Sequence, residues 1–348
     1  MGDVKITRRV FIQTGVLTGA TIAVGPGWFP SLNTLEVAHA QETVRFAWIS
    51  DTHLYPKSVN TRFVDTSTRA VRDVAKQAGQ FDFLIFGGDL AQLGRKDELE
   101  LGNQILSELK IRKLYIPGEH DWYYDMGQHW QNVFGRSPWS MEHKGIHFVG
   151  LNTVGQAPDY WTPRRMNAEQ RMAAMSILDG SIAGPWAGLG PEQLKWLADD
   201  LGKQPKNRPI VIFSHNPLYE VYPPWNFWVR DWREVQEIIK PFQNVTNIHG
   251  HVHQVLYTEM NGGKFRSIGQ LATSWPWPYA PYGTSPLTRK MARADPGDPF
   301  DGVGWAKVTA AAGKVENEYM MWRKNVYALV PEDESQEPPF LSPKLVPE

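Results

Sequence analysis

The sequence of 348 residues contains no cysteine. This absence excludes disulfide bonds, thiolate metal sites and covalently attached c-type haem. Any metal ion that this chain holds must therefore have oxygen and nitrogen ligands. The ten histidines and the 37 acidic residues are the side chains that supply donors of that kind.

The chain also lacks an excess of charge of one sign. Its 36 basic and 37 acidic residues give a formal net charge of -1, and neither kind forms a long run. Nucleic acids and anionic membranes are bound through basic patches or stripes. We therefore expect no nucleic-acid-binding surface, and with 42% hydrophobic residues the composition is that of an ordinary globular protein.

Long hydrophobic runs are absent after residue 40, where no segment has the ~20 apolar residues that cross a bilayer. Before it, ITRRVFIQ (6–13) is followed by a Gly-rich, mildly apolar stretch and by AHA (38–40). This arrangement resembles a twin-arginine export signal with cleavage after Ala40. A short membrane anchor is the alternative, but Gly and Pro interrupt the stretch. We expect the twin-arginine export machinery to deliver a soluble mature chain, without a stable membrane anchor, to the periplasm or the outside of the cell.

From Val44 onwards, apolar runs alternate with segments of helical spacing, a pattern typical of an α/β layered fold. The runs predict strands over 44–50, 81–89, 112–120, 145–152, 208–215 and 244–253. The helical spacing predicts helices over 65–79, between 97 and 110, and over 191–201. The turn signals NGG and AGK predict two antiparallel hairpins at sheet edges, over 255–269 and 304–322.

No repeat or linker divides the range after the export segment, so we predict one domain over 41–330. Residues 331–348 are rich in proline and acidic residues and show no periodicity. This composition predicts an extended or disordered tail.

Polar residues of one chemical kind follow five of the predicted strands. They are DTH (51–53), GGD (87–89), GEHD (118–121), SH (214–215) and GHVH (250–253). The carboxyl ends of parallel strands share one rim of a sheet, so these side chains should converge there. Residues two apart on an extended backbone point the same way, so the first and last motifs each offer two ligands to one place.

Glycines 88, 118 and 250 stand directly before candidate ligands, where a close approach of the backbone is expected. Carboxylates and imidazoles without thiolates suit hard or borderline ions. The sequence therefore predicts a site for iron, manganese, zinc or nickel.

The order of these motifs resembles the pattern of the calcineurin-like metallophosphoesterase superfamily, which is D-x-H, G-D, G-x-H-D, H and G-H-x-H. The resemblance covers nearly all of residues 44–255. The resemblance implies a four-layer α/β sandwich, in which helices flank two central mixed sheets. It also implies two metal ions about 3.5 to 4 Å apart and an enzyme that hydrolyses phosphoric esters. GDLAQLG (88–94) is similar to a stretch of the cyclic-nucleotide phosphodiesterase-like branch of that superfamily.

Carried over residue by residue, the resemblance assigns four ligands to each ion. Those of the first ion would be Asp51, His53, Asp89 and His253. Those of the second would be the bridging Asp89 with Glu119, His215 and His251. A hydroxide bridging the two ions would attack phosphorus. His120 would protonate the leaving oxygen, and Asp121 would orient the ring of His120.

The superfamily pattern mostly has Asn where this sequence has Glu119. The exchange is either conservative, since both side chains offer an oxygen ligand, or a change of charge. Two divalent ions, three carboxylates and a hydroxide make a neutral site, whereas Asn would leave one positive charge. A neutral site attracts a dianionic monoester less and tolerates trivalent iron. The second interpretation predicts a preference for diesters or a mixed-valence metal pair.

Two other functions stay open. The chain could be a non-catalytic, metal-holding binding protein, in which Glu119 quenches the hydroxide and the aromatic stretches 219–232 and 274–286 bind a ligand. The same ions could instead hydrolyse a pyrophosphate-type anhydride. Several tryptophans could stack a nucleobase or pack as a lid. They are Trp161, Trp225, Trp228, Trp275 and Trp277.

Overall fold

The computed structural model describes residues 43–156, 166–172, 187–221, 227–253, 255–274, 303–311 and 313–322. Four sets of predictions fall outside these ranges: the export segment 1–40, the tail 331–348, the aromatic stretch 274–286 after its first residue, and Trp161, Trp225, Trp275 and Trp277. Within the described ranges, every helix is too short or too polar to cross a membrane.

The described strands form two mixed sheets, as the sequence predicts. The first has the order β11 (Lys314–Met321), β10 (Gly304–Ala311), β1 (Val44–Ile49), β2 (Phe83–Phe86) and β3 (Lys113–Tyr115). In it β1, β2 and β3 are parallel, and the β10–β11 hairpin lies antiparallel at one edge.

The second sheet has parallel strands at its centre and an antiparallel strand at each edge. Its order is β4 (Trp139–His143), β5 (Ile146–Gly150), β6 (Ile210–Ser214), β7 (Val245–His249), β9 (Phe265–Gly269) and β8 (Leu256–Met260). The four central strands β5, β6, β7 and β9 are parallel, while β4 and β8 pair antiparallel at the two edges. Both predicted hairpins are thus present.

The inner faces of the two sheets pack through phenylalanines. The rings of Phe46 and Phe213 lie edge to face with centroids 5.4 Å apart, and those of Phe83 and Phe148 with centroids 5.5 Å apart. Side chains alternate across a strand, so the neighbours of these residues face the helices on the outer sides. Ala47 and Ile212 are examples, both buried in the larger apolar core.

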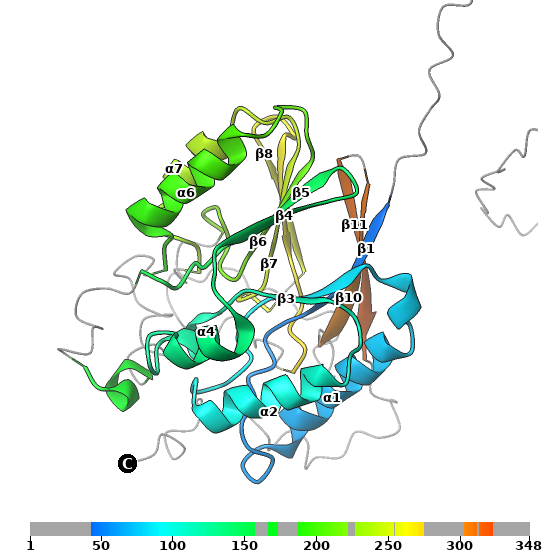
Figure 1. Ribbon diagram of the computed structural model, residues 1–348, viewed down its shortest axis with the longest axis vertical. Coiled ribbons are helices and arrows are strands. Elements are labelled where there is room, and N and C mark those ends of the chain that lie inside the picture. Colours follow the sequence, from blue (N-terminus) through cyan, green and yellow to red (C-terminus); the bar gives the residue numbers. More distant parts are fainter. Residues whose placement is uncertain are drawn as a thin grey trace, which may run out of the picture. The chain divides into compact units, whose positions relative to one another are not determined.

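The helices complete the four layers. They are α1 (Thr61–Ala75), α2 (Lys96–Ser107), α3 (Glu119–Trp122), α4 (Gln128–Phe134), α6 (Gly190–Gly202) and α7 (Trp232–Ile239), with a short 3-10 helix η1 (Ala78–Gln80). Figure 1 shows α6 and α7 beside the sheet of β5 and β6, and α1 and α2 near the sheet of β1 and β2.

Helix α1 begins and ends four residues before the predicted bounds of 65–79. Its N-cap is Asn60, whose Oδ1 accepts a hydrogen bond from the Phe63 amide at 3.2 Å. Thr66 and Ser67 lie inside the helix, where their hydroxyls donate to carbonyls one turn back, at 3.0 and 2.6 Å. The terminal Gly79 belongs to η1.

Residues 119–122 are helical, although the sequence predicts a strand over 112–120. The reason is a local bond in which the Gly118 amide donates to Asp121 Oδ2 at 3.1 Å. A carboxylate at the third helical position that binds the capping amide favours a helix start. Strand β4 and helices α4 and α7 are further elements that the sequence patterns did not predict.

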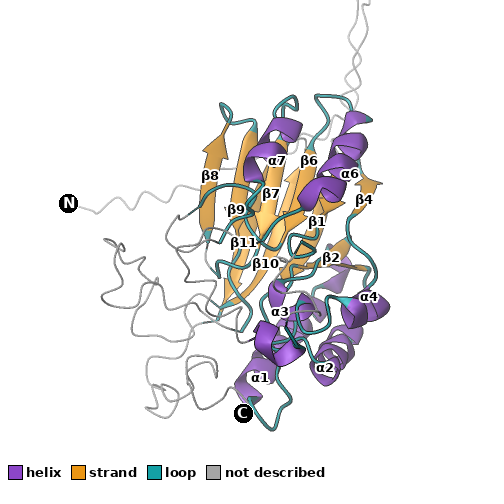
Figure 2. Ribbon diagram, turned by 90° about the vertical axis from the view of Figure 1, so that its left-hand side faces the viewer, coloured by secondary structure: helices purple, strands orange, loops and turns teal. Residues whose placement is uncertain are grey.

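The topology places the ends of five strands at the candidate site. The carboxyl ends of β1, β2 and β3 and those of β6 and β7 lead into the five polar motifs. In Figure 2 the strands of the two sheets overlap, and α3 lies near one end of them.

Candidate metal centre

The backbone turns sharply where the candidate ligands stand. Five of them have a positive φ: Asp51 (55°), His53 (45°), Asp89 (53°), His251 (63°) and His253 (51°). Such a conformation costs a non-glycine residue of order 1 to 3 kcal/mol, and clusters of such residues are typical of functional sites. The predicted extended backbone for the pairs 51/53 and 251/253 is therefore wrong, and each pair reaches the site from a left-handed turn after its strand.

Backbone hydrogen bonds hold these turns together. The Asp51 amide donates to the Gly88 carbonyl at 2.9 Å, and the His53 amide donates to the Asp89 carbonyl at 3.0 Å. The turns after β1 and β2 thus support each other. This arrangement offsets part of the backbone strain.

The glycines before the ligands make the close approach that the sequence predicts. A Cβ on Gly118 would overlap Asp89 Oδ1, and a Cβ on Gly88 would overlap the His215 ring. Gly88 also has a φ of 100°, which a residue with a side chain rarely adopts. Larger residues at these two positions would displace candidate ligands.

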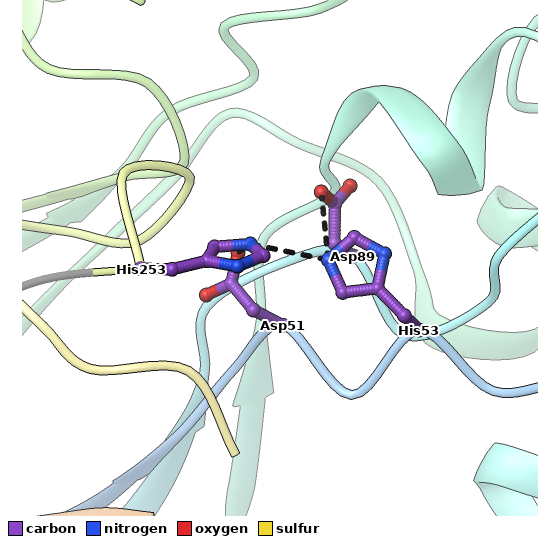
Figure 3. A group of neighbouring side chains, drawn as sticks. All are labelled: Asp51, His53, Asp89 and His253. Atoms are coloured by element: carbon purple, nitrogen blue, oxygen red, sulfur yellow. Dashed lines mark hydrogen bonds and ion pairs between the residues drawn. The ribbon is translucent and has the colours of Figure 1, made fainter. Parts of the chain in front are cut away.

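Four predicted ligands form the first group, which Figure 3 shows with the side chains directed toward one another. Nε2 of His253 lies 3.1 Å from Oδ1 of Asp51 and 3.2 Å from Nε2 of His53. Nε2 of His53 lies 3.7 Å from Oδ2 of Asp89. All four residues are buried.

Asp89 also belongs to the second group, with Glu119, His215 and His251. Nε2 of His215 lies 3.1 Å from Oδ2 of Asp89 and 3.3 Å from Oε2 of Glu119. Nδ1 of His251 lies 2.8 Å from Oε1 of Glu119. The structure thus gathers all seven predicted ligands into two adjoining groups.

The donor set fits two cations. In each group one ligand atom per residue lies within 4.8 Å of all the others. Burial and the neighbouring Glu119 carboxylate raise the pKa of Asp89 well above its ordinary value. Burial would also raise the pKa of Glu119, but the facing imidazoles of His251 and His215 hold it well below its ordinary value. A positive ion would relieve the repulsion between the carboxylates, and the shared Asp89 has the place of a bridging ligand.

The ring of His215 is oriented from outside the group. Its Nδ1 lies 2.7 Å from the Gly87 carbonyl oxygen, which only accepts hydrogen bonds. The carbonyl therefore keeps a proton on Nδ1, and Nε2 is the atom that would bind a cation in the second group. Such outer partners fix the tautomer of a ligating histidine.

His120 lies at the site, but Asp121 does not orient its ring, so that prediction is wrong. Nδ1 of His120 lies 2.6 Å from the Gln92 carbonyl oxygen. Asp121 instead accepts hydrogen bonds from the amides of Leu90 and Ala91, at 2.8 and 2.9 Å. Burial raises the pKa of Asp121 to about 7 and lowers that of His120 to about 4. The role of Asp121 is to hold the turn after β2.

Aromatic side chains border the second group. The ring of Phe227 lies edge to face on that of His251, with centroids 4.8 Å apart. Trp228 is buried beside it in sequence, at 6% exposure. Phe227 stands in the predicted aromatic stretch 219–232, but no sequence pattern distinguished it from its neighbours.

Ser50 and Gln92 are polar residues of the site that the sequence did not reveal. Ser50 donates to Asp51 and accepts from Nε1 of Trp48 at 3.0 Å. Gln92 contacts both His53 and His120. The run GDLAQLG contains Gln92, yet its apolar surroundings gave no sign of a polar role.

Comparisons with known proteins agree with this geometry. The model of the family described as "Calcineurin-like phosphoesterase" matches residues 44–255. The 3',5'-cyclic adenosine monophosphate phosphodiesterase CpdA of Haemophilus influenzae is 24% identical over 242 residues, which are 66% of this chain and 77% of that protein. A protein of Arcobacter nitrofigilis named "Probable glycerophosphodiester phosphodiesterase GpdQ" is 27% identical over 184 residues, 52% of this chain and 59% of that protein.

Among solved structures, a dimetal phosphatase from Danio rerio has a similar fold. The two are 15% identical with a TM-score of 0.53, and the alignment covers 80% of this chain and 99% of the other. At this identity the likeness concerns the fold alone.

Proposed function

Since this chain belongs to the calcineurin-like phosphoesterases and is a metal-dependent hydrolase of phosphoric esters, we propose that its substrate is a phosphate diester. Two relatives support this choice by their names, one acting on a cyclic nucleotide and one named for glycerophosphodiesters. Neither relative identifies the diester that this chain hydrolyses.

The observation that carries the proposal is the third carboxylate of the centre. Glu119 lies at hydrogen-bond distance of His251 and 3.3 Å from His215, in one group with Asp89, which also belongs to the group of Asp51. Each carboxylate lowers the positive potential that two bound ions produce. In a buried site the Coulomb energy depends steeply on charge. A monoanionic diester therefore loses less attraction than a dianionic monoester.

The residues of the chain have separate roles in the reaction. The seven ligands would hold the two ions, and Asp89 would lie between them. When bound, two such ions polarise a phosphoryl oxygen and supply a water of lowered pKa as nucleophile. Nδ1 of His120 is engaged by the Gln92 carbonyl, so Nε2 is the atom that would take up a proton and then deliver it to the leaving oxygen.

The proposal includes the type of metal. Donors are limited to carboxylates and imidazoles, which suit iron, manganese, zinc or nickel. Three carboxylates also tolerate a higher total charge than two divalent ions carry. A mixed-valence pair with one trivalent iron is the alternative to two divalent ions, and it would cancel the charge effect on which the diester preference rests.

The site of action in this proposal is the periplasm or the exterior of the cell. Its support is the sequence ITRRVFIQ with the later AHA, and the absence of cysteine, because of which the fold needs no disulfide bond in either compartment. Replacing Arg8 and Arg9 by lysine should keep the chain in the cytoplasm, whereas unchanged export would contradict this part.

An ester panel tests the proposed substrate class. The metal-loaded protein is assayed with bis(p-nitrophenyl) phosphate, p-nitrophenyl phosphate and inorganic pyrophosphate. We expect kcat/KM to be highest for the diester. Equal or faster hydrolysis of the monoester would overturn the diester preference, and preferential hydrolysis of pyrophosphate would point to anhydrides. A metal-loaded protein inert on all three would support the binding function.

A further inference from the structure

Gln92 contacts two histidines of the centre through two different groups. Its side-chain Oε1 lies 2.8 Å from Nδ1 of His53, and its backbone oxygen lies 2.6 Å from Nδ1 of His120. We infer that Gln92 is a positioning residue that sets the orientation and tautomer of both rings at once. The His53 part concerns metal binding, and the His120 part rests on the proposed function.

The backbone of Gln92 is held firmly enough for this task. Gln92 lies three residues after Asp89 and is 1% exposed. Its amide donates to the Leu54 carbonyl at 3.0 Å, and the Leu54 amide donates to the Leu90 carbonyl at 2.8 Å. Leu54 directly follows His53 in sequence. The turn that carries Gln92 is therefore tied to the turn that carries the metal ligand.

The side chain of Gln92 determines which nitrogen of His53 faces the ions. Oε1 is an acceptor, so the proton of the neutral ring stays on Nδ1. Nε2 then directs its lone pair into the first group, where it lies 3.2 Å from Nε2 of His253. The opposite amide orientation would put a proton on Nε2 and prevent ligation. Partners of this kind raise metal affinity about 10- to 100-fold.

The backbone oxygen of Gln92 has the corresponding effect on His120. A carbonyl only accepts, so Nδ1 of His120 carries a proton and Nε2 remains for exchange with the substrate. The rings of His53 and His120 lie edge to face with centroids 4.7 Å apart. Gln92 thus fixes the position of the His53 ring relative to the His120 ring.

The two contacts can be separated, because a substitution removes the side chain but not the backbone carbonyl. Gln92→Met keeps a similar volume and removes the acceptor for His53. Gln92→Glu keeps an acceptor oxygen. Gln236→Met is the matched control, since Gln236 is a buried glutamine of α7 whose Nε2 donates to the Leu218 carbonyl at 2.9 Å, outside both groups.

The test is calorimetric titration of the chelator-treated full chain with Mn²⁺, together with thermal unfolding of the metal-free and metal-loaded forms. For Gln92→Met we expect one of two Mn²⁺ ions to bind about 10- to 100-fold more weakly, with the other unchanged. Gln92→Glu should restore the affinity to within a few-fold of wild type. Gln236→Met should lower the midpoint of unfolding without changing either Mn²⁺ affinity.

Activity at saturating Mn²⁺ separates this inference from the proposed function. Because Gln92→Met keeps the backbone carbonyl that holds His120, its kcat on bis(p-nitrophenyl) phosphate should then fall less than that of His120→Ala. Wild-type Mn²⁺ binding by Gln92→Met overturns the inference while leaving the proposed function intact. Equal weakening of both ions in Gln92→Met and Gln236→Met also overturns it, since only general stability would be involved. A wild-type chain that binds two ions without hydrolysing any ester contradicts the proposed function and leaves the His53 part standing.

Discussion

Nδ1 of His251 lies 2.8 Å from Oε1 of Glu119, although the two residues follow strands of different sheets. Glu119 follows β3 of the first sheet, and His251 follows β7 of the second. The contact draws the Glu119 carboxylate into the second group of candidate ligands. A residue that departs from the superfamily pattern is thus placed where it adds negative charge to the centre.

Glu119→Asn should change the preference between esters. Removing one negative charge strengthens the attraction for dianionic monoesters more than for monoanionic diesters. We expect the ratio of kcat/KM for bis(p-nitrophenyl) phosphate to that for p-nitrophenyl phosphate to fall about tenfold, which corresponds to about 1.4 kcal/mol. Glu119→Gln removes the same charge and should shift the ratio in the same direction. Unchanged ratios in both variants would contradict the charge argument, and activity appearing only in Glu119→Asn would support the binding function.

Gly118→Ala should damage the metal centre without any change of ligand. The new Cβ would overlap Asp89 Oδ1, and Asp89 belongs to both groups. We expect the purified variant to hold less than half the metal of wild type, measured by elemental analysis. Gly202→Ala at the end of α6 is the control, because its Cβ would meet no atom within 4 Å. Full metal content in Gly118→Ala would show that the turn relaxes at little cost.

Asp82→Asn should lower stability in a pH-dependent way. Burial would raise the pKa of Asp82, but Lys144, the Arg45 amide and His143 hold it below its ordinary value of 3.8. Its carboxylate accepts hydrogen bonds from these partners at 2.6, 2.9 and 3.1 Å respectively. Below about pH 4 the unfolded chain therefore binds more protons than the folded chain. The stabilisation from the Asp82 carboxylate is present at about pH 7 and is lost in acid.

The measurement is urea unfolding of Asp82→Asn and wild type at pH 7 and at about pH 3. At pH 7 we expect the variant to be about 1 to 2 kcal/mol less stable. The difference should narrow at the lower pH. Asp65→Asn, at an exposed ion pair with Lys57, should have almost no effect at either pH. A difference of constant size would mean that Asp82 acts through packing alone.

Glu98→Gln should reveal a pH dependence of the opposite sign. Burial raises the pKa of Glu98 from 4.5 to about 7, although the Leu93 and Arg95 amides lower it. Between these pH values the folded chain binds more protons than the unfolded chain, so stability falls as pH rises. The free energy of unfolding of wild type should fall relative to that of the variant by about 2 to 3 kcal/mol between pH 4.5 and 8. Parallel stability curves would show that Glu98 titrates normally.

The ends of the strands could be predicted because each is marked by neighbouring residues, a polar side chain directly after an apolar run. Asp51, Asp89 and His215 each follow a buried apolar run, and parallel strands bring such ends together. The order of the motifs then supplied the grouping of ligands through the family resemblance. That grouping matches the two groups in the structure.

The details of the backbone could not be predicted in this way. Asp51 has a positive φ where its amide bonds the turn after β2, and His253 has one where its ring contacts Asp51 after a strand of the other sheet. Such contacts join residues that are far apart in sequence. The role of Asp121 was carried over from the superfamily resemblance and is wrong, because α3 directs its carboxylate to the turn after β2. The partner of His120 is a backbone carbonyl, which no sequence pattern marks.

Elemental analysis of the chain, purified without chelator, tests the dinuclear centre most directly. We predict two transition-metal ions per chain in wild type. Asp89→Ala should retain at most one ion, because its carboxylate is common to both groups. One ion or none in wild type, or two ions retained in Asp89→Ala, would contradict a two-ion centre bridged by Asp89.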